Sequence, residues 1–413
     1  MPTGAAELMR GTILDADSFE RGDLDTTSLE SALDQWTHHR STQSHEVAER
    51  IAGCEVLVTN KVIIDAAAMQ NACLKLIVVA ATGTNNIDLV AAKQRNITVC
   101  NVRDYASAAV SQHVFSLLLT LVSHLGDYTQ AVRTGRWQES KVFCLLDYPI
   151  RELDSMTLGI IGYGNIGMQL GVIAEGLGMK VIYFDVESKL PLGNAQPKAT
   201  LSSLLEEAHV VSLHVPQHAS TELLIGNKEI GELRKGAMLI NASRGNVVDL
   251  DALAAALGSG HIGGAAIDVF PVEPRSNNDE FVSPLRGLDQ CILTPHIGGS
   301  TEEAQENIGV EVAEKLTRYS DNGTTTSAVN FPEVALPAHD GKHRLLHVHQ
   351  NIPGVMSAIN QVFSENKVNV SGQYLQTMGD TGYVVIDIEA DYSKALITSL
   401  TAIEGTLRTR VLF

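Results

Sequence analysis

The sequence has little positive charge. It holds 30 lysines and arginines against 48 aspartates and glutamates, which gives a formal net charge of −18 over 413 residues. A chain with this balance repels the phosphates of nucleic acids and of anionic lipid surfaces, and no basic helix suited to reading DNA is apparent. We therefore expect neither a nucleic-acid partner nor a membrane partner.

Long apolar runs and closely spaced cysteines are also absent. The longest apolar stretch, residues 114–125, is interrupted by Ser116, Thr120, Ser123 and His124, whereas a membrane span needs about 18 uninterrupted apolar residues. The N-terminal residues are acidic where a secretion signal would be basic and then apolar. The five cysteines are odd in number and lack C-x-x-C spacing, so neither disulfides nor a metal site is predicted. We expect a reducing, cytoplasmic setting.

What the chain does contain is an alternation of short apolar runs with amphipathic helical patterns. With 44% apolar residues, it can fill the cores of roughly two to three domains. The alternation predicts parallel sheets, the second of them doubly wound. Long helices are expected at 106–125, continuing to 137, and at 302–318. The expected strands are residues 12–14, 55–59, 74–80 and 97–100, then 158–161, 181–184, 209–213, 238–240, 264–267 and 291–293.

The last 70 or so residues change in character. A polar segment at 320–342 contains Pro332 and Pro337, which predict an extended linker. Strands are then expected at 345–349, 368–376, 382–389 and 406–413, with helices at 354–366 and 392–403. This βαββαβ order is that of a ferredoxin-like unit.

The strongest local motif is Gly162-Tyr-Gly164-Asn-Ile-Gly167, which follows a buried strand and opens a helix. The glycines allow a tight turn, close approach of backbone amides to a pyrophosphate, and close packing of helix on strand. Asp185 ends the next strand, where it can accept hydrogen bonds from ribose hydroxyls. Asp185 is followed by Val186 and Glu187, with no arginine. These acidic side chains would repel the 2′-phosphate of NADP, so NAD is favoured. The alternative is a glycine-rich turn that binds nothing.

Three further polar segments follow strands of the same sheet, at the carboxyl ends where open parallel sheets build their sites. Hydride transfer between an alcohol and a carbonyl needs a proton donor or acceptor, which His296 can supply because an imidazole titrates near neutral pH. Glu273 can hold that imidazole, and the planar fork of Arg244 suits a substrate carboxylate. Taken singly, these residues have structural alternatives, namely a surface glutamate, a capping arginine and a core histidine.

With GYGNIG and the segments 243–249, 268–274 and 294–296, the chain resembles the D-isomer-specific 2-hydroxyacid dehydrogenases over essentially its whole length. The resemblance implies an α/β protein: a flavodoxin-like substrate domain (1–104 and 297–331), an inserted NAD-binding Rossmann domain (105–296), a linker (332–342) and an ACT regulatory domain (343–413). It also implies that Arg244 orients the substrate, that Glu273 supports His296, and that His296 is the general acid–base.

The same resemblance implies the binding residues. The substrate is expected at Lys61 and at the backbone amides of Thr82 and Gly83. The residues expected to bind NAD are Gly162, Tyr163, Gly164, Asn165, Ile166, Gly167, Asp185, His214, Val215, Pro216, Ala242, Ser243, Asp268 and Gly298.

The C-terminal part is similar to the bacterial D-3-phosphoglycerate dehydrogenases, as are the segments 298–307 and 330–333. In that family the ACT domain binds L-serine between paired subunits, and His349, Asn351 and Asn369 match the serine-binding positions. The resemblance implies a homodimeric core, which ACT domains could extend to a tetramer. A purely structural dimerising module is the alternative.

The N-terminal third resembles glycerate (hydroxypyruvate) dehydrogenases instead. Its substrate loop offers the single cation Lys61, and an acidic residue follows Trp137 where a lysine would help to hold a phosphate. A buried phosphate with one lysine is poorly compensated, although Arg40 or Lys141 could add charge, and a serine sensor suits the step from 3-phosphoglycerate. We expect NAD-dependent oxidation of 3-phosphoglycerate, with D-glycerate as the alternative substrate and a non-catalytic NAD or amino-acid sensor as the alternative of another class.

Overall fold

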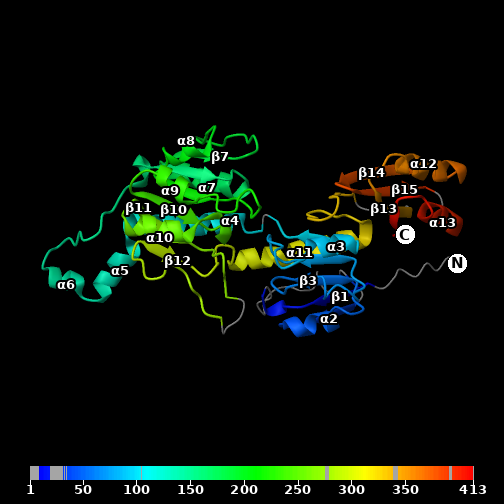
Figure 1. The fold of residues 1–413 in the computed structure, drawn as a ribbon, viewed down its shortest axis with the longest axis horizontal. Coiled ribbons are helices and arrows are strands. Elements are labelled where there is room, and N and C mark those ends of the chain that lie inside the picture. The colour runs from blue at the N-terminus through cyan, green and yellow to red at the C-terminus, as the bar shows by residue number, and fades with distance from the viewer. Residues whose placement is uncertain are drawn as a thin grey trace. The chain divides into compact units, whose positions relative to one another are not determined.

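Parallel sheets organise most of the chain, as a computed structural model shows (Figure 1). The structure describes residues 9–18, 31, 33, 35–103, 105–274, 279–337, 343–389 and 393–412. The chain divides into two units, one formed by Met1–Tyr105 with Gln305–Phe413 and the other by Ala106–Ala304. The first unit contains a five-stranded and a four-stranded sheet, and the second unit contains a seven-stranded sheet.

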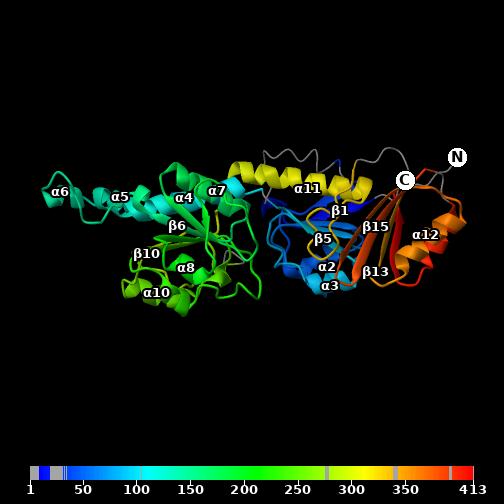
Figure 2. The same ribbon diagram turned by 90° about the horizontal axis from the view of Figure 1, so that it is seen from above.

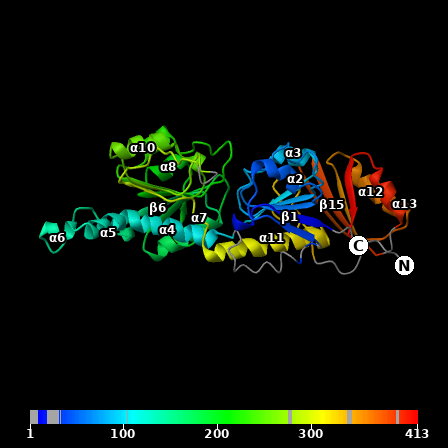
Figure 3. The same cartoon turned by 90° about the horizontal axis from the view of Figure 1, so that it is seen from below.

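The first unit contains a five-stranded parallel sheet in the order β2-β1-β3-β4-β5. This is the strand order of a flavodoxin-like domain, the type of domain that the family resemblance implied. Helix α11 (Glu302–Asn322) covers one face of this sheet, and α2 (Val47–Arg50) and α3 (Leu89–Gln94) cover the other (Figure 3). Only β2 was not predicted, because its sequence QWTH contains no apolar run. The strands are β1 (Arg10–Ile13), β2 (Gln35–His38), β3 (Val56–Thr59), β4 (Leu76–Val79) and β5 (Thr98–Asn101).

The second unit contains a seven-stranded parallel sheet in the order β12-β11-β10-β9-β6-β7-β8. Helices α4 (Ser107–Ser123) and α7 (Asn165–Gly176) cover one face, and α8 (Leu201–Leu205), α9 (Asn227–Glu232) and α10 (Leu250–Gly258) belong to the other (Figure 3). The strand order reverses between β6 and β9, which is where doubly wound sheets bind ligands. The strands are β6 (Thr157–Ile161), β7 (Lys180–Phe184), β8 (Gln196–Pro197), β9 (Val210–Leu213), β10 (Ala237–Asn241), β11 (Ile262–Ile267) and β12 (Cys291–Leu293).

The long helix predicted from 106 to 137 is broken into three. Helix α4 ends at His124, which has a left-handed φ of 50°, and α5 (Leu125–Arg133) is followed by Gly135 at φ 83° and α6 (Arg136–Ser140). No single helix in the described ranges is long and apolar enough to cross a membrane. Helices α4 and α5 would pass such a test together, but they are bent by 61°.

The C-terminal domain has the predicted βαββαβ order: β13 (His343–Gln350), α12 (Val355–Glu365), β14 (Val370–Met378), β15 (Thr381–Ile388), α13 (Lys394–Thr401) and β16 (Thr406–Val411). Its antiparallel sheet has the order β14-β15-β13-β16. The alternation in β15 correctly predicted that Val384, Ile386 and Ile388 are buried together, under α12 and α13. The predicted helix start at Tyr392 and strand end at Phe413 lie outside the described residues.

The other face of this C-terminal sheet lies against α11 and the segment after it (Figure 2). The Arg344 side chain is 2% exposed and forms a two-pronged ion pair with Asp387 at 2.6 and 2.7 Å. Its remaining nitrogen donates to the carbonyl oxygens of Asn322 and Pro337 at 3.2 and 3.3 Å. The Tyr383 hydroxyl donates to the Gly323 carbonyl at 2.7 Å. These bonds join β13 and β15 to the end of α11.

The predicted linker at 332–342 is described as far as Pro337. Val334 and Leu336 are 5% and 8% exposed and belong to the core shared by α11 and the C-terminal sheet. The described part of the linker is therefore packed, because its two apolar side chains fill space that the two sheets leave between them.

His347, on the helix-facing side of β13, provides a test of this packing. Burial, as the main cause, and the nearby His349, as the second, lower the pKa of His347 from 6.5 to about 4. The Nε2 atom of His347 lies 3.0 Å from the Thr406 hydroxyl. The folded side chain is neutral where the unfolded one takes up a proton, so stability is lost as pH falls from 6.5 towards 4. Replacing His347 by glutamine keeps an amide that can bond to Thr406. This change should reduce the acid-induced loss of unfolding free energy by about 3 kcal/mol. Urea unfolding at pH 7 and at pH 4.5 measures it, and equal pH dependence in both proteins would contradict the assignment.

Candidate active site

The glycine turn after β6 brings the ends of three strands together. Gly162 has φ +89°, and a Cβ there would lie 2.4 Å from the carbonyl oxygen of His214, so only glycine fits between β6 and the end of β9. The backbone N–H of Tyr163 donates to Asp185 at 2.7 Å, which ties the turn to the end of β7. A Cβ on Gly164 would meet no atom within 4 Å, so the space above the turn is open.

This turn suits a dinucleotide. Helix α7 begins at Asn165, and the N–H groups of a helix's first turn point at whatever lies beyond its end, together with the positive end of the helix dipole. Asp185 supplies a carboxylate for ribose hydroxyls. Burial lowers the pKa of His214 to about 4, so its imidazole is neutral, and its Nε2 lies 2.8 Å from the Ser212 hydroxyl. When bound, NAD would supply a hydride acceptor at this edge of the sheet.

The other predicted cofactor residues follow neighbouring strands at the same edge. Ser243 is 8% exposed, and both its N–H and its hydroxyl donate to Asn241, at 3.1 and 2.9 Å. Asp268 is 1% exposed at the end of β11. The remainder are Val215 and Pro216 after β9, Ala242 after β10 and Gly298 after β12.

Glu273 and His296 are in direct contact. The Nδ1 atom of His296 lies 2.8 and 3.0 Å from the two carboxylate oxygens of Glu273. Because a carboxylate only accepts, Nδ1 carries the proton and Nε2 is left as the basic nitrogen. Glu273 also accepts the backbone N–H of Phe270 at 3.0 Å, which fixes its orientation. Such an oriented imidazole can take a proton from a hydroxyl or return one to a carbonyl oxygen.

Arg244 lies in a loop that is pressed against the loop of Glu273. A Cβ on Gly245 would lie 2.0 Å from the carbonyl carbon of Phe270, so glycine is required for this approach. The Arg244 side chain is half-buried, its Nη1 donates to the Ser243 carbonyl at 2.6 Å, and its own carbonyl accepts from Asn241 at 2.9 Å. The arginine, the glutamate and the histidine thus come from three adjoining loops at the carboxyl ends of β10, β11 and β12.

Asp268 has a task that the sequence did not indicate. Its Oδ1 accepts the Thr294 hydroxyl at 2.6 Å and the Ile297 N–H at 2.9 Å, and its Oδ2 accepts the Gly298 N–H at 2.8 Å. Burial alone would raise the pKa of this carboxyl group, but hydrogen bonds from His113, Thr294 and the two backbone amides outweigh it and lower the pKa to about 2. One buried carboxylate therefore binds both flanks of His296.

The predicted substrate residues lie in the first unit, at the carboxyl ends of its strands. Lys61 is exposed after β3, and its backbone N–H, like that of Asn60, donates to the buried carboxylate of Asp15, at 2.7 Å for Lys61. Within the described ranges, no acceptor is present for the backbone N–H groups of Thr82 and Gly83. These amides are therefore available to an anionic ligand.

Two residues that fix these loops were missed by sequence reasoning. Asp15 holds the Lys61 loop, and Asn101 holds the next loop by donating to the Thr82 carbonyl at 2.6 Å. Each lies at or just after the end of a predicted strand, which is the signal that could have revealed them. Arg40, a predicted source of extra charge, follows β2 at the same edge but is 3.0 Å from Asp17. Lys141 lies in the second unit, after α6.

The predicted effector residues do not come together within one chain. His349, 2% exposed, pairs with Gly382 at one end of β15, and Asn351 donates to the Gly379 carbonyl nearby at 3.1 Å. Asn369 lies at the other end of the sheet, where its side chain is 3.2 Å from Glu389. The six residue-to-residue steps from Gly382 to Ile388 separate the two ends by about 20 Å.

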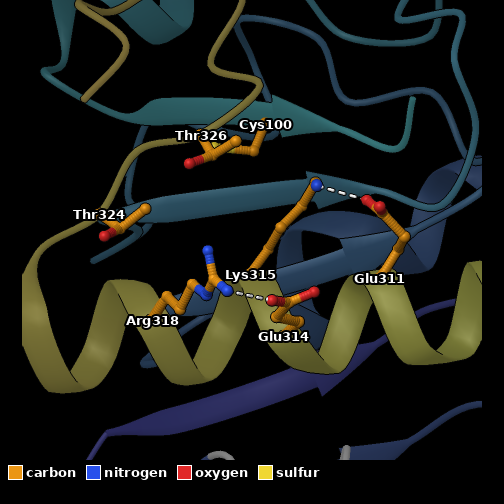
Figure 4. Close-up of a pocket in the computed structure, with 7 residues that line it drawn as sticks. All are labelled: Cys100, Glu311, Glu314, Lys315, Arg318, Thr324 and Thr326. Atoms are coloured by element: carbon orange, nitrogen blue, oxygen red, sulfur yellow. Dashed lines mark hydrogen bonds and ion pairs between the residues drawn. The ribbon is translucent and has the colours of Figure 1, made fainter. Parts of the chain in front are cut away.

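A cavity of about 200 Å³ lies beside α11, and none of the predicted site residues lines it (Figure 4). Lys315 is 2.5 Å from Glu311, and Arg318 is paired with Glu314, so the cations of the cavity are already balanced by carboxylates. Burial raises the pKa of the Cys100 thiol on the opposite wall to about 12. The described residues hold no cluster of three or more histidine, cysteine, aspartate or glutamate side chains suited to a metal ion.

Comparison with known proteins identifies relatives of the second unit and of the C-terminal domain. Residues 115–298 match the NAD-binding domain of the D-isomer specific 2-hydroxyacid dehydrogenases, and residues 345–408 match the ACT domain of the type found in AHAS small subunits. The chain is 52% identical over 349 residues to D-3-phosphoglycerate dehydrogenase of Haemophilus influenzae, covering 84% of each chain. It is 51% identical to the enzyme of the same name from Escherichia coli, covering 83% of each.

Solved structures agree with the fold. The D-lactate dehydrogenase of Aquifex aeolicus, complexed with NAD and lactic acid, superimposes with a TM-score of 0.68 at 26% identity, and the match covers 78% of this chain and all of that one. With its NAD-binding domain, its ACT domain and relatives 51–52% identical over most of their length, the chain belongs to the D-isomer specific 2-hydroxyacid dehydrogenase family, alongside the D-3-phosphoglycerate dehydrogenases.

Proposed function

We propose that the chain oxidises 3-phospho-D-glycerate to 3-phosphohydroxypyruvate with NAD, the first step of L-serine biosynthesis. The observation that carries the proposal is the contact between His296 Nδ1 and the Glu273 carboxylate at 2.8 Å, in a chain 51–52% identical to D-3-phosphoglycerate dehydrogenases. When bound, NAD would supply the acceptor for the hydride of the carbinol carbon, and each other task falls to a side chain or amide of this protein.

In the proposed reaction, Nε2 of His296 takes the hydroxyl proton as the carbonyl forms, and it donates that proton in the reverse reduction. Glu273 keeps the imidazole oriented and stabilises its protonated form. Arg244 orients the substrate carboxylate by parallel hydrogen bonds. The amides of Thr82 and Gly83 bind the same carboxylate, and Lys61 binds the phosphate. Support for the last two comes from the available N–H groups and from the fixed, exposed Lys61 loop.

The substrate is tested by comparing kcat/KM for 3-phosphoglycerate and D-glycerate at saturating NAD. We expect 3-phosphoglycerate to be preferred by at least about 100-fold. Replacing Lys61 by methionine should narrow the preference by about 10- to 100-fold, which is the worth of one hydrogen bond to a charged group. A preference of the wild-type protein for D-glycerate would assign it instead as a glycerate dehydrogenase, as the resemblance of the N-terminal third suggests.

We also propose that L-serine is the effector of the ACT domain and that two copies of the chain form its site. Support comes from the separation of Asn369 from His349 and Asn351, since one chain alone leaves the three residues at opposite ends of a sheet. Strand β14 is an edge strand. If two β14 strands pair in antiparallel fashion, the start of one lies beside the end of the other, near the Asn351 loop of that copy.

The effector proposal makes a quantitative prediction for Asn351. Replacing it by alanine removes an amide that can hold the effector's charged end, so the serine concentration for half-inhibition should rise by about tenfold or more. Asn366 is a matched control, because it is another exposed asparagine of the same domain, with its amide bonded to Val362 on its own helix. Equal serine sensitivity in Asn351→Ala and the wild type, measured in initial-rate assays, would contradict the assignment.

The proposed homodimer core forms through the arm of the second unit that contains α5, α6 and residues 141–150. Support comes from its apolar surface, since Phe143 is 89% and Leu146 78% exposed. The arm is internally fixed, because Trp137 donates to the Phe143 carbonyl at 3.0 Å and Arg136 pairs with Asp147. Replacing both Phe143 and Leu146 by aspartate should halve the mass of the core assembly in sedimentation.

A reducing, cytoplasmic setting is proposed as well, supported by five cysteines that are all free.

A further inference from the structure

His113 lies on the inner side of α4, which is apolar apart from His113 and Ser111. It is not among the residues expected to bind NAD or substrate, yet its Nε2 lies 3.2 Å from the Thr294 hydroxyl and 3.4 Å from Asp268 Oδ1. Its side chain is 17% exposed and that of Asp268 is 1% exposed. The histidine thus faces the carboxylate that binds both flanks of His296.

The hydrogen-bond pattern fixes the role of His113. The Thr294 hydroxyl has one proton, and it donates this proton to Asp268 at 2.6 Å. Thr294 can therefore only accept from His113, so the Nε2 atom of His113 carries a hydrogen. That hydrogen points at the threonine oxygen and at the adjoining carboxylate oxygen, and it supports both partners at once. His113 is also the one basic side chain within 4 Å of Asp268 in the described part of the chain.

The loop that this cluster holds needs such support. His296 has a left-handed φ of 56°, a conformation that costs a residue with a side chain roughly 1–2 kcal/mol. The Asp268 carboxylate offsets this cost by binding Thr294 on one side and the amides of Ile297 and Gly298 on the other. Each additional donor to a buried carboxylate further stabilises its charged form. His113 supplies one such donor from a different element, the helix α4.

We propose that His113 is a positioning residue for His296, acting through Thr294 and Asp268 to hold the 294–298 loop in the conformation that keeps His296 against Glu273. The proposal rests on the proposed function of His296 as the general acid–base. It adds α4 to the elements that determine the geometry of proton transfer. Helix α4 also contacts the helix of the glycine turn, where Ser111 donates to the Ile166 carbonyl at 3.3 Å, so α4 is anchored beside both parts of the site.

Two variants separate this role from simple packing. His113→Gln keeps a donor amide near the position of Nε2, whereas His113→Leu keeps much of the volume and loses the donor. For the leucine variant we expect kcat to fall about 10- to 100-fold, the cost of misplacing a catalytic group by about 1 Å, with KM for 3-phosphoglycerate and the NADH dissociation constant changed less than threefold. The glutamine variant should restore kcat to within about threefold of the wild type.

A second measurement does not depend on activity. Hydrogen exchange of the peptide that contains the Ile297 and Gly298 amides should accelerate at least tenfold in His113→Leu and stay near the wild-type rate in His113→Gln. Absence of turnover in the wild type with normal protection in the glutamine variant would refute the proposed function while leaving the positioning role intact. Unchanged exchange and unchanged kcat in the leucine variant, or equal losses in both variants, would overturn the role of His113.

Discussion

Replacing His296 by asparagine should lower kcat by about 10²- to 10⁴-fold, the usual contribution of a positioned acid–base group. Asparagine is the informative replacement because it tolerates the left-handed backbone that His296 adopts at φ 56°. The loop should therefore keep its shape while the basic nitrogen opposite Glu273 is lost. Stopped-flow reduction of 3-phosphohydroxypyruvate by NADH measures the chemical step.

The control for this prediction is cofactor binding. The His296 side chain contacts Glu273, so the NADH dissociation constant, from nicotinamide fluorescence, should stay within about twofold of the wild-type value. Turnover of His296→Asn within tenfold of the wild type would mean that the proton is carried by another group.

Replacing Gly164 by valine should raise the NADH dissociation constant by at least ~100-fold, or about 2.7 kcal/mol. A side chain there meets no protein atom within 4 Å, so the fold should tolerate it. The same side chain would occupy the open space in which a pyrophosphate approaches the start of α7. Loss of binding with an unchanged melting temperature would therefore locate the cofactor at the glycine turn.

Gly176 offers a matched control for Gly164. It lies at the other end of α7, and a Cβ on it would likewise meet no atom within 4 Å, so Gly176→Val should bind NADH as the wild type does. Gly162→Ala gives the contrasting result, since its Cβ would lie 2.4 Å from the His214 carbonyl oxygen and should lower the melting temperature as well. Normal NADH binding by Gly164→Val would place the cofactor elsewhere.

Sequence reasoning succeeded where an element depends on its own stretch of chain. The glycine turn after β6, the helix that follows it and the position of Asp185 at the end of β7 were predicted from spacing, because these elements follow one another directly in the chain. Their roles in binding the cofactor stay predictions. The buried face of β15 followed from alternation. The five-stranded and the seven-stranded sheet were both predicted to be parallel. Strands β2 and β8 were missed, since a polar edge strand and a strand of two residues leave no apolar run.

Roles that depend on contacts between distant segments were not predicted. His113 and Thr294 are 181 residues apart, and no local pattern relates them. The task of Asp268 in holding the His296 loop depends on four donors from two segments of the chain, α4 and the 294–298 loop. Arg344 likewise gave no signal, although its bonds to Asp387 and to the end of α11 join the C-terminal sheet to that helix within the first unit. Only the folded chain brings such partners together.

The central claim is that the chain transfers the C2 hydrogen of a D-2-hydroxyacid to NAD while His296 takes the hydroxyl proton. The most direct test uses 3-phospho-D-glycerate deuterated at C2, with hydrazine to trap the 2-oxo product and mass spectrometry of the NADH formed. The account predicts that the reduced nicotinamide gains one deuterium and that the L-isomer yields none. NADH without deuterium, or no NADH from either isomer, would contradict it.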